Sequence, residues 1–170
     1  MGSERPAAAP LRILIVCHAN TGRSAIAEAL LKKMLRVRRR DDVCVRSGGI
    51  APYARDSSLI SLDTRLVLRE DAIEIPEDAT ACDLKCHRYH LAEADVILTM
   101  TEEQKRMLGG FSEAAGKKVL TLKEVAGEAG DIEDPAGRDI EYYRHCRDEI
   151  RRCLEKAIEC LVPAPVADGR

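Results

Sequence analysis

The stretch Leu11-Arg-Ile-Leu-Ile-Val-Cys17-His-Ala-Asn-Thr-Gly-Arg23-Ser24-Ala-Ile-Ala-Glu-Ala-Leu30 decides the fold of this chain. Residues 13–16 are apolar and rich in β-branched side chains, a composition that favours a buried strand. The next residues after Cys17 are small or polar, and Arg23 and Ser24 then open a run of strong helix formers. The pattern predicts a buried strand, a tight loop and a helix N-terminus.

The predicted loop has the composition of an anion-binding site. Its backbone N–H groups and the positive end of the following helix would converge on one point. At that point a thiolate on Cys17 would be stabilised and nucleophilic, and Arg23 would add a planar set of donors for phosphate oxygens. The alternative is a buried cysteine at a strand end, with Arg23 solvated. The residues expected to bind phosphate are His18, Ala19, Asn20, Thr21, Gly22 and Ser24.

A second candidate residue lies in Asp131-Ile-Glu-Asp-Pro-Ala-Gly137, which precedes a long helical pattern. An Asp-Pro pair by itself favours a turn. Beside a nucleophile that expels an alkoxide, phenoxide or amine, Asp134 also suits a general acid that protonates the leaving group. Pro135 would stiffen the backbone behind it.

The segment Val16-Cys-His-Ala-Asn-Thr-Gly-Arg-Ser24 resembles the signature of the low-molecular-weight protein phosphatases, Val-Cys-x-Gly-Asn-x-Cys-Arg-Ser. That family carries a later Asp-Pro, which Asp134-Pro135 matches in order, and the resemblance covers about residues 11–161. It implies a four-stranded parallel α/β fold and a phosphatase that needs no metal or cofactor. Its substrates would be phosphorylated proteins.

The resemblance also implies a role for each site residue. Cys17 would attack phosphorus and form a phosphocysteine, while Arg23 and the loop N–H groups hold the phosphoryl oxygens. Ser24 would donate its hydroxyl to the thiolate, and Asn20 would brace the loop. Asp134 would act first as an acid and then as a base toward water.

Substrate preference depends on Thr21. In members that resemble protein-arginine phosphatases this position is threonine, whereas tyrosine-specific members carry a bulkier aliphatic residue. A compact polar side chain leaves room for a guanidinium near phosphorus, so we expect phosphoarginine to be preferred, with phosphotyrosine as the alternative.

Three departures from the family pattern affect the site. Ala19 replaces a glycine, so the loop must accept a β-carbon there. Gly22 replaces the second cysteine, so Cys17 lacks a neighbouring resolving thiol and is expected to overoxidise more easily. Ala136 and Gly137 stand where an aromatic residue often walls the pocket, which either widens the entrance or leaves the wall to His18, Tyr53 or Phe111.

Strands and helices alternate along the rest of the chain. This alternation predicts a parallel sheet with helices on both faces, whose ligands bind beyond the carboxyl ends of the strands. Thr101-Glu-Glu-Gln104 has the form of a capping box, and Asp139 is the expected N-cap of the last helix. We expect strands over 43–46, 94–100 and 119–122, and helices over about 23–39, 57–70, 101–108 and 140–161.

Length and composition bound the class of protein. The 170 residues are 45% apolar and 33% charged, which suits one globular domain over residues 11–162, with flexible tails at 1–10 and 163–170. A net charge of −2 indicates neither nucleic-acid nor membrane binding. The absence of a long apolar segment or a signal-like N-terminus leads us to expect a cytoplasmic protein whose seven cysteines are free thiols. The oligomeric state cannot be inferred.

Three alternatives concern the other cysteines and the loop. Cys82 and Cys86 are available for a thiol relay of the kind arsenate reductases use, although they precede the strand that the relay normally follows. With His87 and His90 they also invite a zinc site, in which Cys82, Cys86 and His90 would share one helix face; packing is the plainer interpretation. A non-catalytic phosphoprotein-binding module would need Arg23 but neither Cys17 nor Asp134. Cys146, Cys153 and Cys160 recur every seven residues and are expected to face the core.

Overall fold

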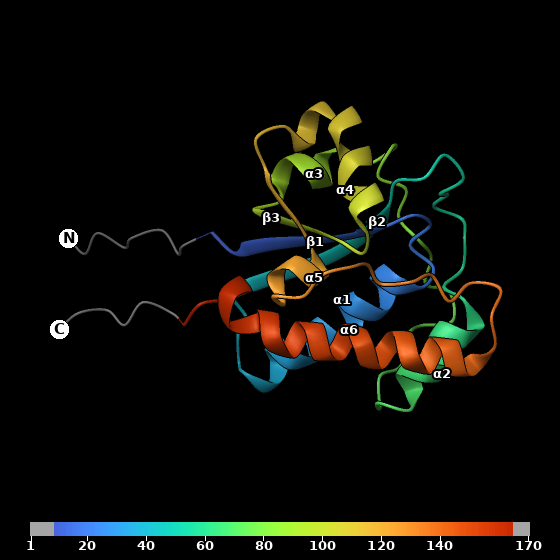
Figure 1. Cartoon of the computed structure of the whole chain (residues 1–170). Helices are drawn as coiled ribbons and strands as arrows, with labels where there is room; N and C mark the ends of the chain where they lie inside the picture. Colours follow the sequence, from blue (N-terminus) through green and yellow to red (C-terminus); the bar gives the residue numbers. More distant parts are fainter. Residues whose placement is uncertain (1–8, 165–170) are drawn as a thin grey trace, which may run out of the picture.

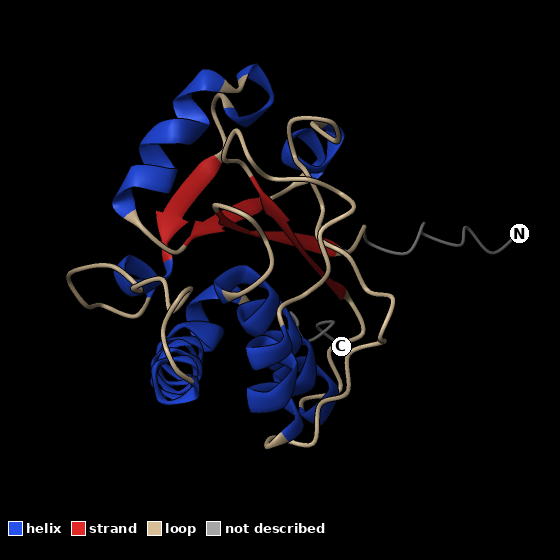
Figure 2. Ribbon diagram, turned by 90° about the vertical axis from the view of Figure 1, so that its right-hand side faces the viewer, coloured by secondary structure: helices blue, strands red, loops and turns tan. Residues whose placement is uncertain are grey.

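A parallel sheet forms the centre of the computed structural model, which describes residues 9–164 (Figures 1 and 2). All three strand pairings are parallel, as the sequence predicts. Apart from residues 9, 10, 163 and 164, the two expected tails lie outside the described residues. The strand order is β2-β1-β3-β4, with β1 at Leu11–Cys17, β2 at Val43–Gly49, β3 at Val96–Thr99 and β4 at Lys118–Thr121.

Strand β1 is central because it is paired on both edges and covered on both faces. It runs beside β2 with Cys17 opposite Gly49, and beside β3 with Val16 opposite Thr99. Its residues Ile13, Leu14, Ile15 and Val16 are each at most 2% exposed. Strands buried on both faces are expected to be continuous apolar runs, which explains the composition of β1. The strand delivers Cys17 to the carboxyl edge of the sheet.

The larger helical layer packs on one face of the sheet (Figure 1). Ile26 and Leu31 of α1 meet Ile150 and Leu154 of α6 in a single apolar core. Asp139 caps α6 by accepting from the N–H groups that follow it, so the predicted N-cap is confirmed. This layer contains α1 (Arg23–Val37), α2 (Leu62–Arg69), α5 (Leu122–Val125) and α6 (Ile140–Leu161).

The smaller layer covers the opposite face, where Leu14, Val16 and Ile97 of the sheet meet Leu91 and Leu108. Helices on both faces are therefore confirmed (Figure 2). The Thr101–Gln104 capping box is present, and Gln104 is fully buried. This layer contains α3 (Tyr89–Glu93), α4 (Glu102–Met107) and the short 3-10 turns η1 (Leu108–Gly110) and η2 (Ser112–Ala114).

Several expected helix and strand limits are wrong. The helix predicted over 57–70 is confined to α2, because Leu59 pairs with Thr80 and Ser61 is the N-cap. The strand predicted over 119–122 ends one residue earlier, since Thr121 caps α5. Helix α1 ends at Val37 rather than near residue 39, because Arg39 adopts a left-handed φ of 54°.

The seven-residue cysteine repeat on α6 faces the core only in part. Cys146 and Cys153 are buried, as predicted, but Cys160 is exposed. An α-helix drifts by roughly 20° per heptad, so a strict seven-residue repeat rotates away from a fixed face. Within residues 9–164, no helix is both long enough and apolar enough to cross a membrane.

Candidate active site

Cys17 is 3% exposed at the end of β1, and its sulfur is held by the loop that follows. The N–H of Asn20 donates to Cys17 Sγ at 3.2 Å. Ser24 Oγ lies 2.9 Å from the same sulfur, from where its hydroxyl is able to donate to a thiolate. Both groups are therefore placed to donate hydrogen bonds to the sulfur.

Asn20 braces the loop through all of its side-chain polar atoms. Its backbone is left-handed, with φ at 63°, which asparagine tolerates better than most residues. Nδ2 donates to Ser24 Oγ at 2.7 Å and to Ser47 Oγ at 2.8 Å, and Oδ1 accepts from the N–H of Cys82 at 2.9 Å. Ser47 in turn donates to Glu28. The resemblance implies such a brace, but no sequence pattern indicates Ser47 or Cys82 as its partners.

The loop offers unpaired backbone donors. Within the described part of the chain, the N–H groups of Thr21, Gly22 and Arg23 donate to no acceptor. They lie at the N-terminus of α1, where the helix dipole also favours an anion. The arrangement therefore suits a phosphate or another tetrahedral oxyanion.

Gly49 is a residue of the site that sequence reasoning missed. A β-carbon there would approach His18 O to 2.7 Å and Ala19 C to 2.8 Å, closer than packed atoms allow. The loop, including Ala19 at the position of a family glycine, thus rests directly on the end of β2. The sequence Ser47-Gly48-Gly49 suggests a turn, but the structure continues β2 through it, and Gly49 permits the close approach of the loop.

Arg23 joins the loop to a segment more than 100 residues later. Its guanidinium is 4% exposed and donates from Nη1 to the carbonyl of Ile132 at 2.9 Å. Nη2 lies 3.5 Å from Asp134 Oδ2 and 3.2 Å from His18 Nδ1. The structure therefore brings Cys17, Arg23 and Asp134 into one site, as the segment between α5 and α6 passes the loop (Figure 1).

Asp134 stands at the open side of this site. Its side chain is 50% exposed, and Oδ1 accepts from the N–H of Ala136 at 3.0 Å, which fixes the turn through Pro135. Oδ2 lies toward Arg23. Beside it lies a groove of about 530 Å³ whose lining includes Glu133, Arg138 and Tyr142.

An aromatic wall is present on the side of His18. Its ring stacks on Tyr53, with ring centroids 6.5 Å apart. Partial desolvation and the charge of Asp134 raise the pKa of the Tyr53 phenol. Phe111, the third residue considered for this wall, instead packs beneath the guanidinium of Arg88, 4.8 Å away.

Gln104 supports His18 from the smaller helical layer. Its Nε2 lies 3.1 Å from His18 Nδ1, and its Oε1 accepts from the N–H groups of Met100 and Thr101. The capping box in the sequence identified Gln104 as a helix cap but gave no sign of this second contact. Glu103 adds a carboxylate 3.8 Å from His18 Nε2.

Cys82, Cys86 and His90, expected on one helix face in the zinc alternative, do not share a helix. Cys82 and Cys86 lie in the loop before α3, and only His90 belongs to that helix, so this expectation was wrong. Within residues 9–164, no group of three or more His, Cys, Asp or Glu side chains is arranged to hold a metal. Burial raises the pKa of the Cys82 thiol to about 11, the opposite of what a relay thiol needs.

Comparison with known proteins decides the family. The family profile described as "Low molecular weight phosphotyrosine protein phosphatase" matches residues 12–163. This chain belongs to that family. As a low-molecular-weight phosphatase it is a hydrolase, and its sheet and helices are those of the family fold.

Relatives with two different substrate names resemble this low-molecular-weight phosphatase about equally. A protein-arginine-phosphatase of Geobacillus stearothermophilus is 36% identical over 153 residues, which cover 89% of this chain and 97% of that protein. The low molecular weight protein-tyrosine-phosphatase PtpB of Staphylococcus haemolyticus is 35% identical over 146 residues, covering 86% and 96%. A solved YwlE arginine phosphatase mutant with a phosphorylated active-site serine superposes with a TM-score of 0.80 at 31% identity, covering 91% and 97%.

Proposed function

We propose that this chain is a metal-independent protein phosphatase that acts through a phosphocysteine on Cys17. One observation carries the proposal: the Cys17 sulfur accepts from the Asn20 N–H and faces Ser24 Oγ, in a loop whose Thr21, Gly22 and Arg23 N–H groups have no acceptor among the described residues. A nucleophile inside an anion site is the arrangement that phosphoryl transfer through sulfur requires.

In the first step the thiolate of Cys17 attacks phosphorus. A sulfur–phosphorus bond forms while the bond from phosphorus to the leaving oxygen or nitrogen breaks. The leaving atom keeps the electron pair and takes a proton from Asp134, which is accessible on the open side of the site. Arg23 and the loop N–H groups stabilise the negative charge on the three equatorial oxygens.

In the second step water hydrolyses the phosphocysteine. The oxygen of the water molecule bonds to phosphorus while the carboxylate of Asp134 accepts a proton from that water. The sulfur–phosphorus bond breaks, and its electron pair returns to Cys17 as a thiolate, which Ser24 and the Asn20 N–H stabilise. Inorganic phosphate is released and both residues return to their starting states.

We further propose that phosphoarginine is preferred over phosphotyrosine. Thr21 supports this preference, because its short polar side chain leaves space beside the phosphoryl group for a planar guanidinium. The arginine phosphatase and the tyrosine phosphatase PtpB are almost equally similar to this chain, at 36% and 35% identity, so overall similarity does not favour either substrate.

The test compares two peptides of one sequence that carry phosphoarginine or phosphotyrosine at the same position. We expect the wild type to have the higher kcat/KM on phosphoarginine, and Thr21→Ile to reverse the order. Cys17→Ser should abolish turnover of both peptides. A wild type that prefers phosphotyrosine, together with an unchanged ratio in Thr21→Ile, would refute the preference while leaving the reaction intact.

A further inference from the structure

The carbonyl of Thr21 is held from outside the loop by the beginning of α2. It accepts from the N–H of Ser61 at 3.1 Å and from Thr64 Oγ1 at 3.1 Å. These two donors come from a segment about 40 residues later in the chain, and the reaction described above does not involve them.

The direction of the Thr64 hydroxyl follows from its partners. Ser61 Oγ lies 2.7 Å from Thr64 Oγ1 and donates to it, while also accepting from the N–H of Thr64. A hydroxyl has one proton, and the carbonyl of Thr21 can only accept. Thr64 therefore donates its proton to Thr21. Because the side chain is fully buried, no water competes for this proton.

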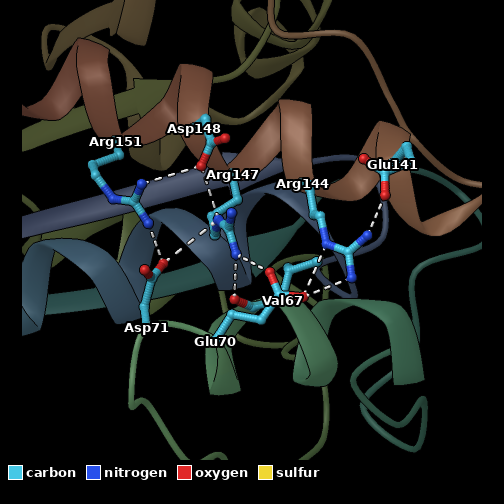
Figure 3. Close-up of polar contacts among 8 residues, drawn as sticks. All are labelled: Val67, Glu70, Asp71, Glu141, Arg144, Arg147, Asp148 and Arg151. Carbon is cyan, nitrogen blue, oxygen red and sulfur yellow. Dashed lines mark hydrogen bonds and ion pairs between the residues drawn. The ribbon is translucent and has the colours of Figure 1, made fainter.

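Helix α2 is itself anchored to α6 by arginines (Figure 3). Arg147 donates to the carbonyl of Val67 at 2.8 Å and to Glu70 at 2.6 Å. Arg144 contacts Glu70 at 2.9 Å, and Arg151 pairs with Asp71. These bonds hold the C-terminal end of α2 against α6, while Ser61 and Thr64 lie at its N-terminal end.

The two bonds to Thr21 also determine where the next N–H points. The peptide bond is planar and trans, so the Thr21 carbonyl and the Gly22 N–H point in opposite directions. With the carbonyl directed at α2, the Gly22 N–H points away from it. That N–H has no acceptor among the described residues, and it belongs to the loop that surrounds Cys17.

Gly22 allows the Thr21–Gly22 peptide to flip more easily than another residue would. Its φ of −131° lies on the negative side. Flipping the Thr21–Gly22 peptide by about half a turn would carry this φ into the left-handed region, which glycine occupies readily and other residues rarely do. The flipped form would present a carbonyl oxygen where an anion is bound.

We propose that Ser61 and Thr64 are positioning residues that hold the Thr21–Gly22 peptide so that the Gly22 N–H faces the phosphoryl group. The proposal rests on the phosphatase function inferred above, but not on the choice between phosphoarginine and phosphotyrosine. The two hydrogen bonds matter because position 22 is a glycine. A residue with a β-carbon would by itself disfavour the flipped peptide.

The first experiment replaces the donor and keeps its shape. Thr64→Val removes the hydroxyl, and Thr64→Ser retains it. A neutral hydrogen bond contributes about 1 kcal/mol, so we expect Thr64→Val to lower kcat/KM on para-nitrophenyl phosphate and affinity for inorganic phosphate by roughly fivefold. Thr64→Ser should keep both close to wild type. Thermal unfolding of each variant shows whether the fold is intact.

The second experiment repeats the comparison with Gly22→Ala. An added β-carbon has room, since its nearest contact is Thr64 Oγ1 at 3.9 Å, and the family signature carries a cysteine at this position. Alanine disfavours the flipped peptide. In the Gly22→Ala background, Thr64→Val should therefore change kcat/KM and phosphate affinity very little. A general loosening of α2 would instead give the same loss in both backgrounds.

NMR spectroscopy provides a direct readout. The Gly22 amide resonance should shift on titration of the wild type with inorganic phosphate, and the shift should be smaller in Thr64→Val. Unchanged phosphate affinity, turnover and Gly22 shift in Thr64→Val would overturn the proposal. If the phosphatase function itself were wrong, the wild type would neither turn over the aryl phosphate nor bind phosphate at this loop, which is a different outcome.

Discussion

Arg147 is expected to contribute far more to stability than its neighbour Arg144, although both contact Glu70 (Figure 3). Arg147 is 8% exposed and donates to the buried carbonyl of Val67. Substitution by methionine keeps most of the apolar contact but leaves this carbonyl without its donor. An unsatisfied buried polar group costs about 1–3 kcal/mol.

The surrounding acids add only a moderate amount. Glu70, Asp71 and Asp148 are 38%, 23% and 56% exposed, so water can reach all three after Arg147 is replaced, and Asp71 keeps its pair with Arg151. We therefore expect Arg147→Met to lower the free energy of unfolding by about 2–3 kcal/mol. The side chain of Arg144 is 38% exposed and forms only ion pairs, so Arg144→Met should cost less than about 1 kcal/mol.

Urea unfolding of the two variants and the wild type measures the difference. Both variants should shift the midpoint without changing the slope of free energy against urea, because the surface exposed on unfolding is nearly the same. Added salt should reduce the difference in unfolding free energy between Arg144→Met and the wild type, because it screens exposed ion pairs. The difference between Arg147→Met and the wild type should persist. Equal losses in the two variants would refute the reasoning, since burial would then have no part in the effect.

Three further outcomes are expected. Asp134→Asn should lower kcat by roughly 10²–10⁴ on substrates with poor leaving groups and by less on para-nitrophenyl phosphate, which a kinetic comparison of the two would reveal. Gly22→Cys should restore a resolving thiol, so that peroxide yields a reversible disulfide with Cys17, detectable by mass spectrometry, where the wild type is overoxidised. Hydrogen bonds, chiefly from Arg152, lower the pKa of Glu128 to about 2, so its stabilisation is complete above its ordinary pKa and lost as the pH falls toward 2. The melting temperature of Glu128→Gln should therefore fall less steeply than that of the wild type over this acid range.

Local sequence was sufficient for the element that carries the nucleophile. Three local patterns follow one another in the chain: the β-branched run of β1, the small or polar residues of the loop and the helix formers of α1. Each favours its own backbone conformation without contacts to distant segments. The same holds for the caps at Thr101 and Asp139, where a side chain bonds to backbone within three residues. Asp134 was indicated by motif order, and the structure places its Oδ2 3.5 Å from Arg23 Nη2.

Local sequence patterns did not predict the contacts between distant segments. The partners of Asn20 come from β2 and from the loop before α3, and the Thr21 carbonyl is held by Ser61 and Thr64. The start of α2 was misplaced for the same reason, since the residues before Ser61 are drawn into pairing with Thr80. Gly49 matters only because two strands meet beside the loop.

The sequence alone indicated the parallel α/β fold, the thiol at the end of β1 and the arginine after the loop, because local residue patterns specify each of them. The candidate acid Asp134 was indicated instead by the order of the family motifs. Only the tertiary structure decided which groups hold the loop in its anion-binding shape. Those groups are single hydroxyls, carbonyls and N–H donors, which have no periodicity in the sequence and acquire their role when the packed helices bring them within hydrogen-bond distance.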